Sequence, residues 1–217
     1  LFALTVLSCT KLKEGLNGTL TNQQTASSLG PGGTQLLLQA AYTDVGGPFT
    51  AQDLVFSLEE NSTDESLFPT RGGDWNDNGV WRVVHNHTWN ADHLHVLQAY
   101  NSLNKLNFDA TNVLQFNPSK QQAAEARFLR ALSLYTLLDL YGQFPFRNPG
   151  DNLLNAPKVY FGDSAINFII SELTTILPDL ADGPMSQATP DAAKVLLMRC
   201  YLNKVAFLNR QAPTFTN

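Results

Sequence analysis

The segment from Ala123 to Phe146 constrains the fold of this chain more than any other stretch. Its sequence, AAEARFLRALSLYTLLDLYGQFPF, carries apolar side chains that cover more than one side of a helix at about 100° per residue. No face of this helix is cleanly polar, so it needs neighbours on several sides and belongs in the interior of a helical assembly. Gly142 and Pro145 predict its end, because glycine suits the left-handed residue after a helix and proline cannot continue one.

Helical patterns recur along the rest of the chain. Apolar residues repeat at helical spacing in four other segments: 34–45, 94–114, 164–177 and the stretch after Thr189. We expect Gly46-Gly47-Pro48 to end the first, Asn117-Pro118-Ser119 to open the central helix, and Pro190 to take the first position of the last. The last two segments predict an antiparallel hairpin similar to a tetratricopeptide repeat. The sequence therefore predicts an all-α fold with helical hairpins and long loops.

Length, charge and cysteine content limit the classes of protein to consider. With 217 residues, of which 43% are hydrophobic, the chain is long enough for one sizeable domain with a real core. The formal net charge is −5 and no run of lysine or arginine is present, which argues against a nucleic-acid partner. Cys9 and Cys200 form neither a disulfide framework nor a zinc site, and we interpret Cys200 as a buried small apolar residue.

The first nine residues, LFALTVLSC, form an apolar run that is too short to span a bilayer. Such a run is typical of the end of a signal peptide, and Val6-Leu7-Ser8-Cys9 is similar to a bacterial lipobox, in which the cysteine thiol carries diacylglycerol. An ordinary buried strand or helix start with a free cysteine is the alternative. We predict a tether over residues 10–33 and a helical domain over residues 34–217 that is cut at its C-terminal end.

Residues 71–95 have the most unusual composition of the chain. This stretch, RGGDWNDNGVWRVVHNHTWNADHLH, contains all three tryptophans and all four histidines. It has the glycine and asparagine content of a loop, but far more aromatic residues than a linker carries. Loops that hold large aromatic side chains next to polar ones are typical of binding sites.

Three roles compete for these residues. Two His-x-His pairs with a nearby aspartate offer metal ligands, but the spacing matches no known zinc scaffold; they are His85, His87, His93, His95 and Asp92. Residues 74–79 fit the opening of a calcium-binding loop, yet His85 stands at the twelfth position, where a bidentate glutamate is required. We therefore expect no metal and no other cofactor. The third role is packing of the loop onto the helices, and Trp75 and Trp81 suit packing and sugar contact equally.

Charged side chains gather in two further places. The only concentration of carboxylates is Glu59, Glu60, Asp64 and Glu65. Glycosidases need a pair of carboxylates, but a polar stretch of this kind is more often a solvated turn, and we expect no catalytic residue here. Arg127 and Arg130 lie three positions apart on the central helix, and we expect them to form salt bridges to neighbouring helices.

Four sequence elements together closely resemble the SusD/RagB family of surface glycan-binding lipoproteins. They are EARFLRAxxxxxLxxLYGxxPF, Thr-Arg-Gly-Gly-Asp-Trp, Trp-Arg and His-Asn-His-Thr-Trp. The resemblance runs from Cys9 to about Leu208 and corresponds to the N-terminal portion of such a protein. It implies a SusD-like helical scaffold, a non-catalytic role, and a lipid anchor at Cys9 that holds the protein at the surface of the outer membrane. It also implies delivery of captured oligosaccharides to a SusC-like TonB-dependent transporter.

The resemblance further implies a glycan-binding site on the tryptophan-rich loop. We predict that Trp75 and Trp81 cover the apolar face of a sugar ring while Asp74 and Arg82 bind its hydroxyls. The spacing of Asp74 and Arg82 resembles that of the sugar-contacting polar residues of the family. Two alternatives remain open: a tetratricopeptide-type adaptor that binds protein without glycan, and a glycoside hydrolase.

Overall fold

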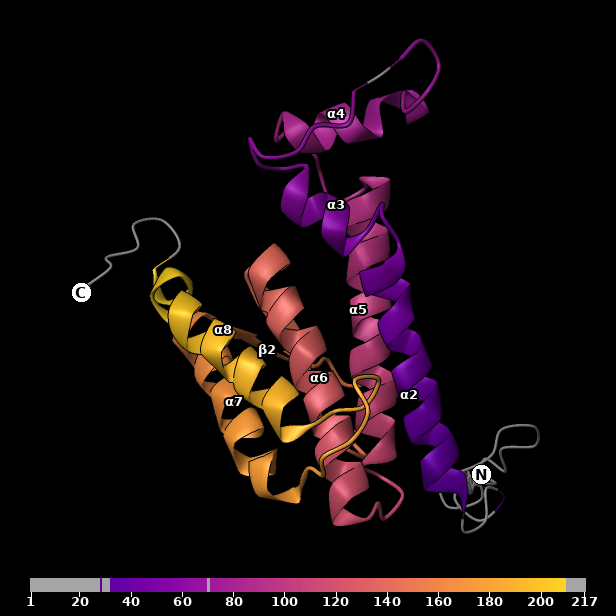
Figure 1. The fold of residues 1–217 in the computed structure, drawn as a ribbon, viewed down its shortest axis with the longest axis vertical. Coiled ribbons are helices and arrows are strands. Elements are labelled where there is room, and N and C mark those ends of the chain that lie inside the picture. The colour runs from indigo at the N-terminus through magenta and orange to yellow at the C-terminus, as the bar shows by residue number, and fades with distance from the viewer. Residues whose placement is uncertain (1–27, 29–31, 70, 210–217) are drawn as a thin grey trace, which may run out of the picture.

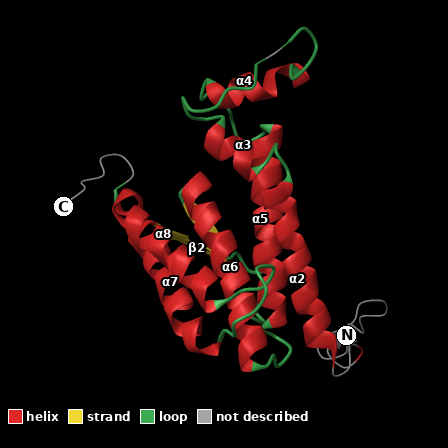
Figure 2. Cartoon of the chain, in the orientation of Figure 1, coloured by secondary structure: helices red, strands yellow, loops and turns green. Residues whose placement is uncertain are grey.

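The computed structural model describes residue 28 and residues 32–69 and 71–209, so Cys9, its lipobox and the predicted tether up to residue 31 lie outside the described residues apart from Ser28. Helices dominate the described part, as the sequence predicts (Figure 2). The elements in chain order are α2 (Gly33–Thr50), α3 (Val55–Glu60), η2 (Asp77–Gly79), α4 (Val80–His85), α5 (Leu94–Val113), α6 (Lys120–Tyr141), β1 (Gln143–Phe146), β2 (Lys158–Phe161), α7 (Gly162–Ile176), η3 (Leu177–Asp179) and α8 (Pro190–Leu208).

Helix α6 lies at the centre of the assembly, and this confirms the interior position predicted for it. It packs against α2, α5, α7 and α8 (Figure 1). Ser119 begins the helix with a capping box: its hydroxyl accepts the N–H of Gln122, and the side-chain oxygen of Gln122 accepts the N–H of Ser119. Gly142 follows the helix in the left-handed conformation, with φ of 75°, as the sequence predicts.

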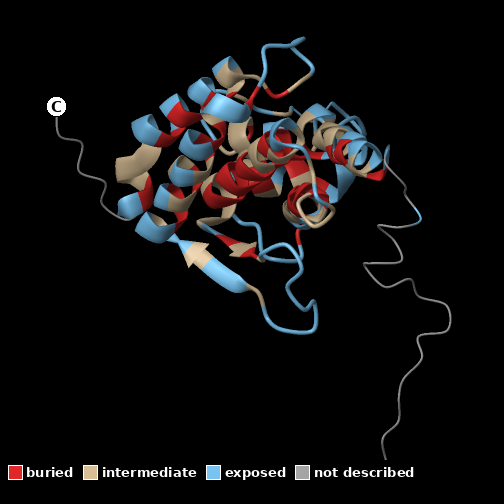
Figure 3. Cartoon of the chain, turned by 90° about the horizontal axis from the view of Figure 1, so that it is seen from below, coloured by how far each residue is buried: buried red, intermediate tan, exposed pale blue. Residues whose placement is uncertain are grey.

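The long helices pack as successive neighbours, α2 on α5, α5 on α6, α6 on α7 and α7 on α8. Helices α7 and α8 run antiparallel and form the predicted hairpin (Figure 1). Thr189 caps α8 by accepting the N–H of Ala192, and Pro190 occupies its first turn. Buried residues gather where the helices face one another (Figure 3). The core consists of two adjoining clusters, one beneath α2 and the other between α6, α7 and α8.

Helix α2 is longer than predicted. The sequence Gly46-Gly47-Pro48 does not end it, and the helix continues to Thr50. Pro48 lies in the last turn, where it lacks the N–H for a bond to the carbonyl four residues earlier, so local preference opposes the helix at this point. Pro48 is buried, and Phe49 packs against both core clusters. Burial of these two side chains accounts for the extension, since tertiary packing routinely overrides weak helix propensity.

Two short strands were not predicted from the sequence, which indicates only a linker between the prolines at 145 and 157. Strands β1 and β2 pair antiparallel, with Gln143 opposite Phe161 and Phe146 opposite Lys158. Their aromatic side chains pack onto α7, and the ring centroids of Phe146 and Phe168 are 4.6 Å apart. Strands β1 and β2 thereby hold the segment between α6 and α7 against the core.

A buried ion pair ties α6 to α7. Arg127 and Arg130 both bind the carboxylate of Glu172, which confirms that these arginines join neighbouring helices. Burial raises the pKa of Glu172, but the hydrogen bonds and charges of the two arginines outweigh burial, so the pKa is lower than usual. The guanidinium of Arg130 also lies 5.2 Å from the ring centroid of Phe146.

A second polar network joins α2 to the segment that leads into α8. The hydroxyl of Tyr42 donates to Glu125 over 2.6 Å and accepts the N–H of Ala188 over 2.9 Å. The side-chain amide of Gln187 donates to the other oxygen of Glu125. Burial and the bond to Glu125 raise the pKa of Tyr42 well above its usual value, so the hydroxyl stays protonated.

The outer face of α8 exposes a row of apolar side chains, namely Val195, Met198, Tyr201, Leu202 and Leu208. On the inner face, Cys200 is a free and buried thiol, as predicted, and burial raises its pKa to about 12. Within the described ranges, no helix combines the length and the hydrophobicity needed to span a bilayer.

Candidate functional site

The tryptophan-rich segment lies across one end of α2 and α5, together with α3 (Figure 1). The segment was expected to be a loop, but it contains the 3-10 turn η2 and the short helix α4. Gly79 permits the change of direction between them, with φ of 83°. The segment is therefore a folded layer that begins where α3 ends and leads directly into α5.

Four aromatic rings form the centre of this layer. Trp81 is the hub: its ring centroid lies 4.5 Å from that of Phe68, 4.5 Å from that of His95 and 5.5 Å from that of Trp75. Phe68 also contacts Trp75, at 5.2 Å. These separations and tilted geometries are favourable for aromatic pairs. We call Phe68, Trp75, Trp81 and His95 the aromatic cluster.

Two polar side chains hold the aromatic cluster in place. Asn61 is fully buried, and its side-chain amide donates to the carbonyl of Trp81 while its oxygen accepts the N–H of Phe68. Asp77 accepts the indole N–H of Trp81 over 2.6 Å. Each bond satisfies a group that burial would otherwise leave unpaired. The cluster is therefore preorganised by α3 and η2.

The histidines contribute to packing. His93 binds the carbonyl of Val80 through Nε2, and His87 binds that of Ser62 in the same way. Burial lowers the pKa of His95, so its imidazole is neutral beside Trp81 at neutral pH. In the part of the chain that the structure describes, no three His, Cys, Asp or Glu side chains are grouped to hold a metal. The hydrogen bonds of His87 and His93 and the ring contact of His95 with Trp81 fit packing, the third role considered for this segment.

The four predicted sugar-contacting residues occupy different environments. Trp75 is 38% exposed, and the exposed residues Asp74 and Arg82 directly precede Trp75 and directly follow Trp81 in sequence. Trp81 is only 4% exposed, so its ring supports Trp75 and offers little surface to a ligand. A backbone bridge between Arg71 and Asp74 and a positive φ of 56° at Trp75 define the turn that carries Asp74 and Trp75.

A cleft of about 470 Å³ opens between the tryptophan-rich layer, the end of α6 and α8. It is lined by Leu58, Glu59, Ser62, Val84, Trp89, Val96, Asp139, Leu140, Tyr141 and Arg199. Trp89 is 42% exposed and packs against His87, with ring centroids 5.3 Å apart. The cleft has the size of a small-molecule site and combines aromatic, apolar and charged groups.

Charges in the cleft are close enough to influence one another. Burial raises the pKa of Glu59, the negative charge of Asp139 raises it further, and the positive charge of Arg199 opposes both. Carboxylates of this kind accept hydrogen bonds from sugar hydroxyls. A carboxyl of raised pKa near a second carboxylate is also the arrangement that glycosidases use.

Sequence reasoning did not bring these cleft residues together. The sequence predicts a solvated turn at Glu59, whereas in the structure Glu59 lies in α3 and is partly buried in the cleft wall. Asp139 and Arg199 were not singled out, although each interrupts an apolar helical pattern, and such an interruption was the available signal. Only the tertiary structure shows that α3, α6 and α8 bring them to one place.

No protein-family model matches the chain. Among curated proteins, the starch-binding protein SusD of Bacteroides thetaiotaomicron is 30% identical over 158 residues, a match that covers 68% of this chain and 27% of SusD. Among solved structures, surface glycan-binding protein A from Bacteroides uniformis has a similar fold, with a TM-score of 0.57 and 18% identity over 85% of this chain and 47% of that protein. The chain thus spans about a quarter and about half of these two proteins.

These findings agree with the motifs. The sequence match covers most of the chain, and the second protein shares its helical arrangement. The central helix and the following turn, which carry the EARFLRA and LYGxxPF elements, are present as the resemblance implies. The chain is thus similar to SusD in sequence over most of its own length, and its motifs and fold are SusD-like.

Proposed function

We propose that this chain belongs to a non-catalytic surface protein that captures oligosaccharides. The observation that carries the proposal is Trp75, a partly exposed indole that rests on the buried ring of Trp81, with the exposed residues Asp74 and Arg82 next to these tryptophans in sequence. A pyranose has an apolar C–H face, which suits an indole held rigidly from behind. The names of the two similar proteins, starch-binding and surface glycan-binding, support the same ligand class.

The expected contribution of the ring is moderate. Covering about 100 Å² of sugar with indole is worth about 2.5 kcal/mol at about 25 cal/mol per Å², before ordering costs. Asp74 and Arg82 orient the sugar, because a carboxylate accepts hydrogen bonds from hydroxyl groups and a guanidinium donates hydrogen bonds to hydroxyl oxygens. Preorganisation by Asn61 and Asp77 lowers the cost of ordering the site.

We further propose that the whole protein is anchored to the outer membrane through a lipid on Cys9 and passes its ligand to a SusC-like TonB-dependent transporter. The lipobox-like sequence Val6-Leu7-Ser8-Cys9 and the similarity to SusD support this part of the proposal. A lipid anchor keeps a helical domain at the membrane without a spanning helix.

Calorimetric titration with maltoheptaose, a soluble starch oligosaccharide, tests the proposal. We expect Asp74→Ala, Trp75→Ala or Arg82→Ala to weaken binding about tenfold or more, which corresponds to about 1.4 kcal/mol, with an unchanged Tm. Trp81→Ala should weaken binding through loss of the support for Trp75. Unchanged affinity in all four variants would overturn the assignment of this site.

Glycan hydrolysis is a second candidate function, because the carboxyl groups of Glu59 and Asp139 both line the cleft. Hydrolysis predicts release of reducing ends from maltoheptaose and complete loss of release in Glu59→Gln. Capture without cleavage predicts no turnover in either protein and a measurable binding heat in both. The third candidate, a protein adaptor, predicts neither heat nor turnover with any oligosaccharide.

A further inference from the structure

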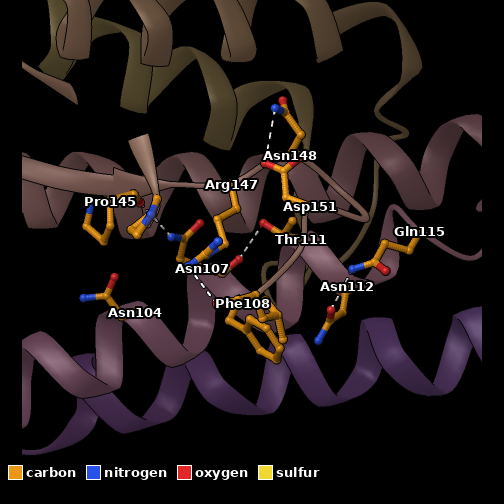
Figure 4. A pocket seen from close by; sticks show the side chains of 12 residues that line it. Asn104, Asn107, Phe108, Thr111, Asn112, Gln115, Pro145, Arg147, Asn148 and Asp151 are labelled. Carbon is orange, nitrogen blue, oxygen red and sulfur yellow. Dashed lines mark hydrogen bonds between the residues drawn. The ribbon is translucent and has the colours of Figure 1, made fainter. Parts of the chain in front are cut away.

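A pocket of about 300 Å³ lies at the other end of α5 from the aromatic cluster, between α5 and the loop that joins β1 to β2 (Figure 4). Helix α5 contributes Asn104, Asn107, Phe108 and Thr111, and the loop contributes Arg147 and Asp151. The residues of α5 are three or four positions apart and so lie on one face of the helix. No role predicted from the sequence involves this pocket.

Both walls of the pocket are fixed by hydrogen bonds. On α5, Asn107 is only 9% exposed and donates to the carbonyl of Pro145, and the hydroxyl of Thr111 donates to the carbonyl of Asn107. In the loop, Arg147 donates to the carbonyls of residues 152 and 153, and Asp151 accepts the backbone N–H of Asn148. The pocket is therefore built before any ligand arrives.

Several polar atoms of the pocket are open to a ligand. Among the described residues, the side-chain oxygens Oδ1 of Asn104, Asn107 and Asp151 have no hydrogen-bond partner, because the bonds of these side chains use their other polar atoms. Three acceptors in one concave site call for a ligand rich in donors. Vicinal hydroxyl groups supply such donors.

The remaining features define the ligand further. Phe108 is 45% exposed and offers a ring face at the edge of the pocket. Arg147 and Asp151 are the charged groups that line the pocket, so the lining has no net charge. An aromatic face beside amide and carboxylate oxygens, without net charge, fits an uncharged sugar better than a phosphate or an acidic peptide.

We propose that this pocket is a second carbohydrate-binding site, which takes one or two units of a neutral glycan across the ring of Phe108. The choice of ligand class rests on the glycan binding proposed above, whereas the pocket itself is separate. Asn107 lies 12 residues after His95 on α5, which corresponds to about 18 Å along the helix at about 1.5 Å per residue. Helix α5 therefore joins the second site to the aromatic cluster that supports Trp75, and a long glycan that reaches both sites gains affinity from the second contact.

Saturation-transfer NMR on the full chain tests the second site with four uncharged probes: maltoheptaose, cellohexaose, xylohexaose and mannohexaose. We expect Phe108→Ala and Asn104→Ala each to weaken binding of at least one probe about fivefold or more, with an unchanged Tm. The matched control is Phe56→Ala, which removes an exposed phenylalanine of α3 that does not line this pocket and should leave binding unchanged.

The same experiment separates the two sites. If Trp75→Ala abolishes all binding and Phe108→Ala changes none, the second site is overturned and the proposed function stands. If Phe108→Ala weakens binding and Trp75→Ala does not, the second site stands and the site of the proposed function falls. Binding of none of the four sugars, or binding of a tetraglycine peptide in their place, overturns the second site.

Discussion

The indole of Trp75 rests against that of Trp81 with ring centroids 5.5 Å apart and ring planes 66° apart. The two side chains have the same chemistry but differ in burial, since Trp75 faces solvent and Trp81 is enclosed. Trp81 also carries a hydrogen bond to Asp77, and its carbonyl accepts one from Asn61. We therefore assign ligand contact to Trp75 and support of its ring to Trp81. This division can be measured, because the two roles affect affinity and stability differently.

Alanine substitutions of the two tryptophans should differ in their effect on stability. We expect Trp81→Ala to lower the free energy of unfolding by about 3–5 kcal/mol, because it empties the hub of the aromatic cluster. Trp75→Ala should cost about 1 kcal/mol or less, since the side chain is partly exposed, while it removes most of the affinity for glycan. Urea unfolding and calorimetric titration measure the two effects. Equal loss of stability in both variants would contradict the division.

The ion pair of Glu172 should make stability depend on acid pH. The pKa of Glu172 is lower in the folded chain than its usual value of 4.5, so the pair contributes stability above about pH 4.5 that is lost as the pH falls through the folded pKa. Glu172→Gln leaves Arg130 buried without its partner and should cost about 3–5 kcal/mol at pH 7. The difference from the wild type should shrink toward pH 3.

An exposed pair provides the matched control for that substitution. Lys194 and Asp191 are 3.0 Å apart on the surface of α8. Lys194→Ala should cost less than about 1 kcal/mol at pH 7, because solvent screens such pairs. If Lys194→Ala and Glu172→Gln are equally destabilising, burial of the ion pair is not the cause.

Weak acid should loosen the aromatic cluster. The pKa of His95 is lowered in the folded chain mainly by burial, partly opposed by Asp53 and Asp77, so protonation favours the unfolded state. The cluster should be fully stable above the ordinary imidazole pKa of 6.5 and lose stability as the pH falls through the lower folded value. We expect tryptophan emission to shift to the red between pH 7 and pH 5. His95→Phe keeps a ring beside Trp81 and should abolish the shift.

Membrane attachment should depend on Cys9. With Cys9→Ser in the full-length protein, we expect loss of labelled palmitate and release from the membrane fraction, because no acyl chain is attached. Cys200→Ser is the matched control, since that thiol is buried and protonated and should have no effect on attachment. Retention of the Cys9→Ser protein in the membrane would contradict the anchor.

The apolar row on α8 should promote association. Exposed apolar patches of this kind bind hydrophobic dyes and other protein surfaces. We expect Met198→Lys with Leu202→Lys to reduce dye binding and self-association about twofold or more and to change stability by less than about 1 kcal/mol. Leu36→Lys, at an exposed leucine of α2, is the control. Equal dye binding in the double variant and the wild type would contradict this role.

Elements with strong local signals were predictable from the sequence. Helix α6 has a capping box at Ser119, a continuous apolar pattern and Gly142 after its last turn, and all three point to the same boundaries. Helix α2 lacked this agreement. Its local signal at Gly46-Gly47-Pro48 indicated an end, whereas packing of Phe49 against residues distant in sequence favoured continuation.

Features that depend on distant residues were not predictable. The pairing of β1 with β2 joins Gln143 to Phe161 across an irregular loop, and no local pattern fixes that register. Burial of Trp81 was equally hidden, because it is set by Phe68, His95 and Asn61. The sequence indicated the segment that carries the candidate site but not which of its tryptophans faces solvent.

The bond from the N–H of Ala188 to the hydroxyl of Tyr42 joins residues 146 positions apart. Contacts between such distant positions raise the contact order of a fold and slow its assembly, because the intervening chain must be ordered first. We therefore expect α5, α6 and α7 to dock before α2 meets the segment that leads into α8. During synthesis, α2 leaves the ribosome before α5 and α6, so its apolar face is a target for chaperones until those helices cover it, and the bond to Ala188 forms only later.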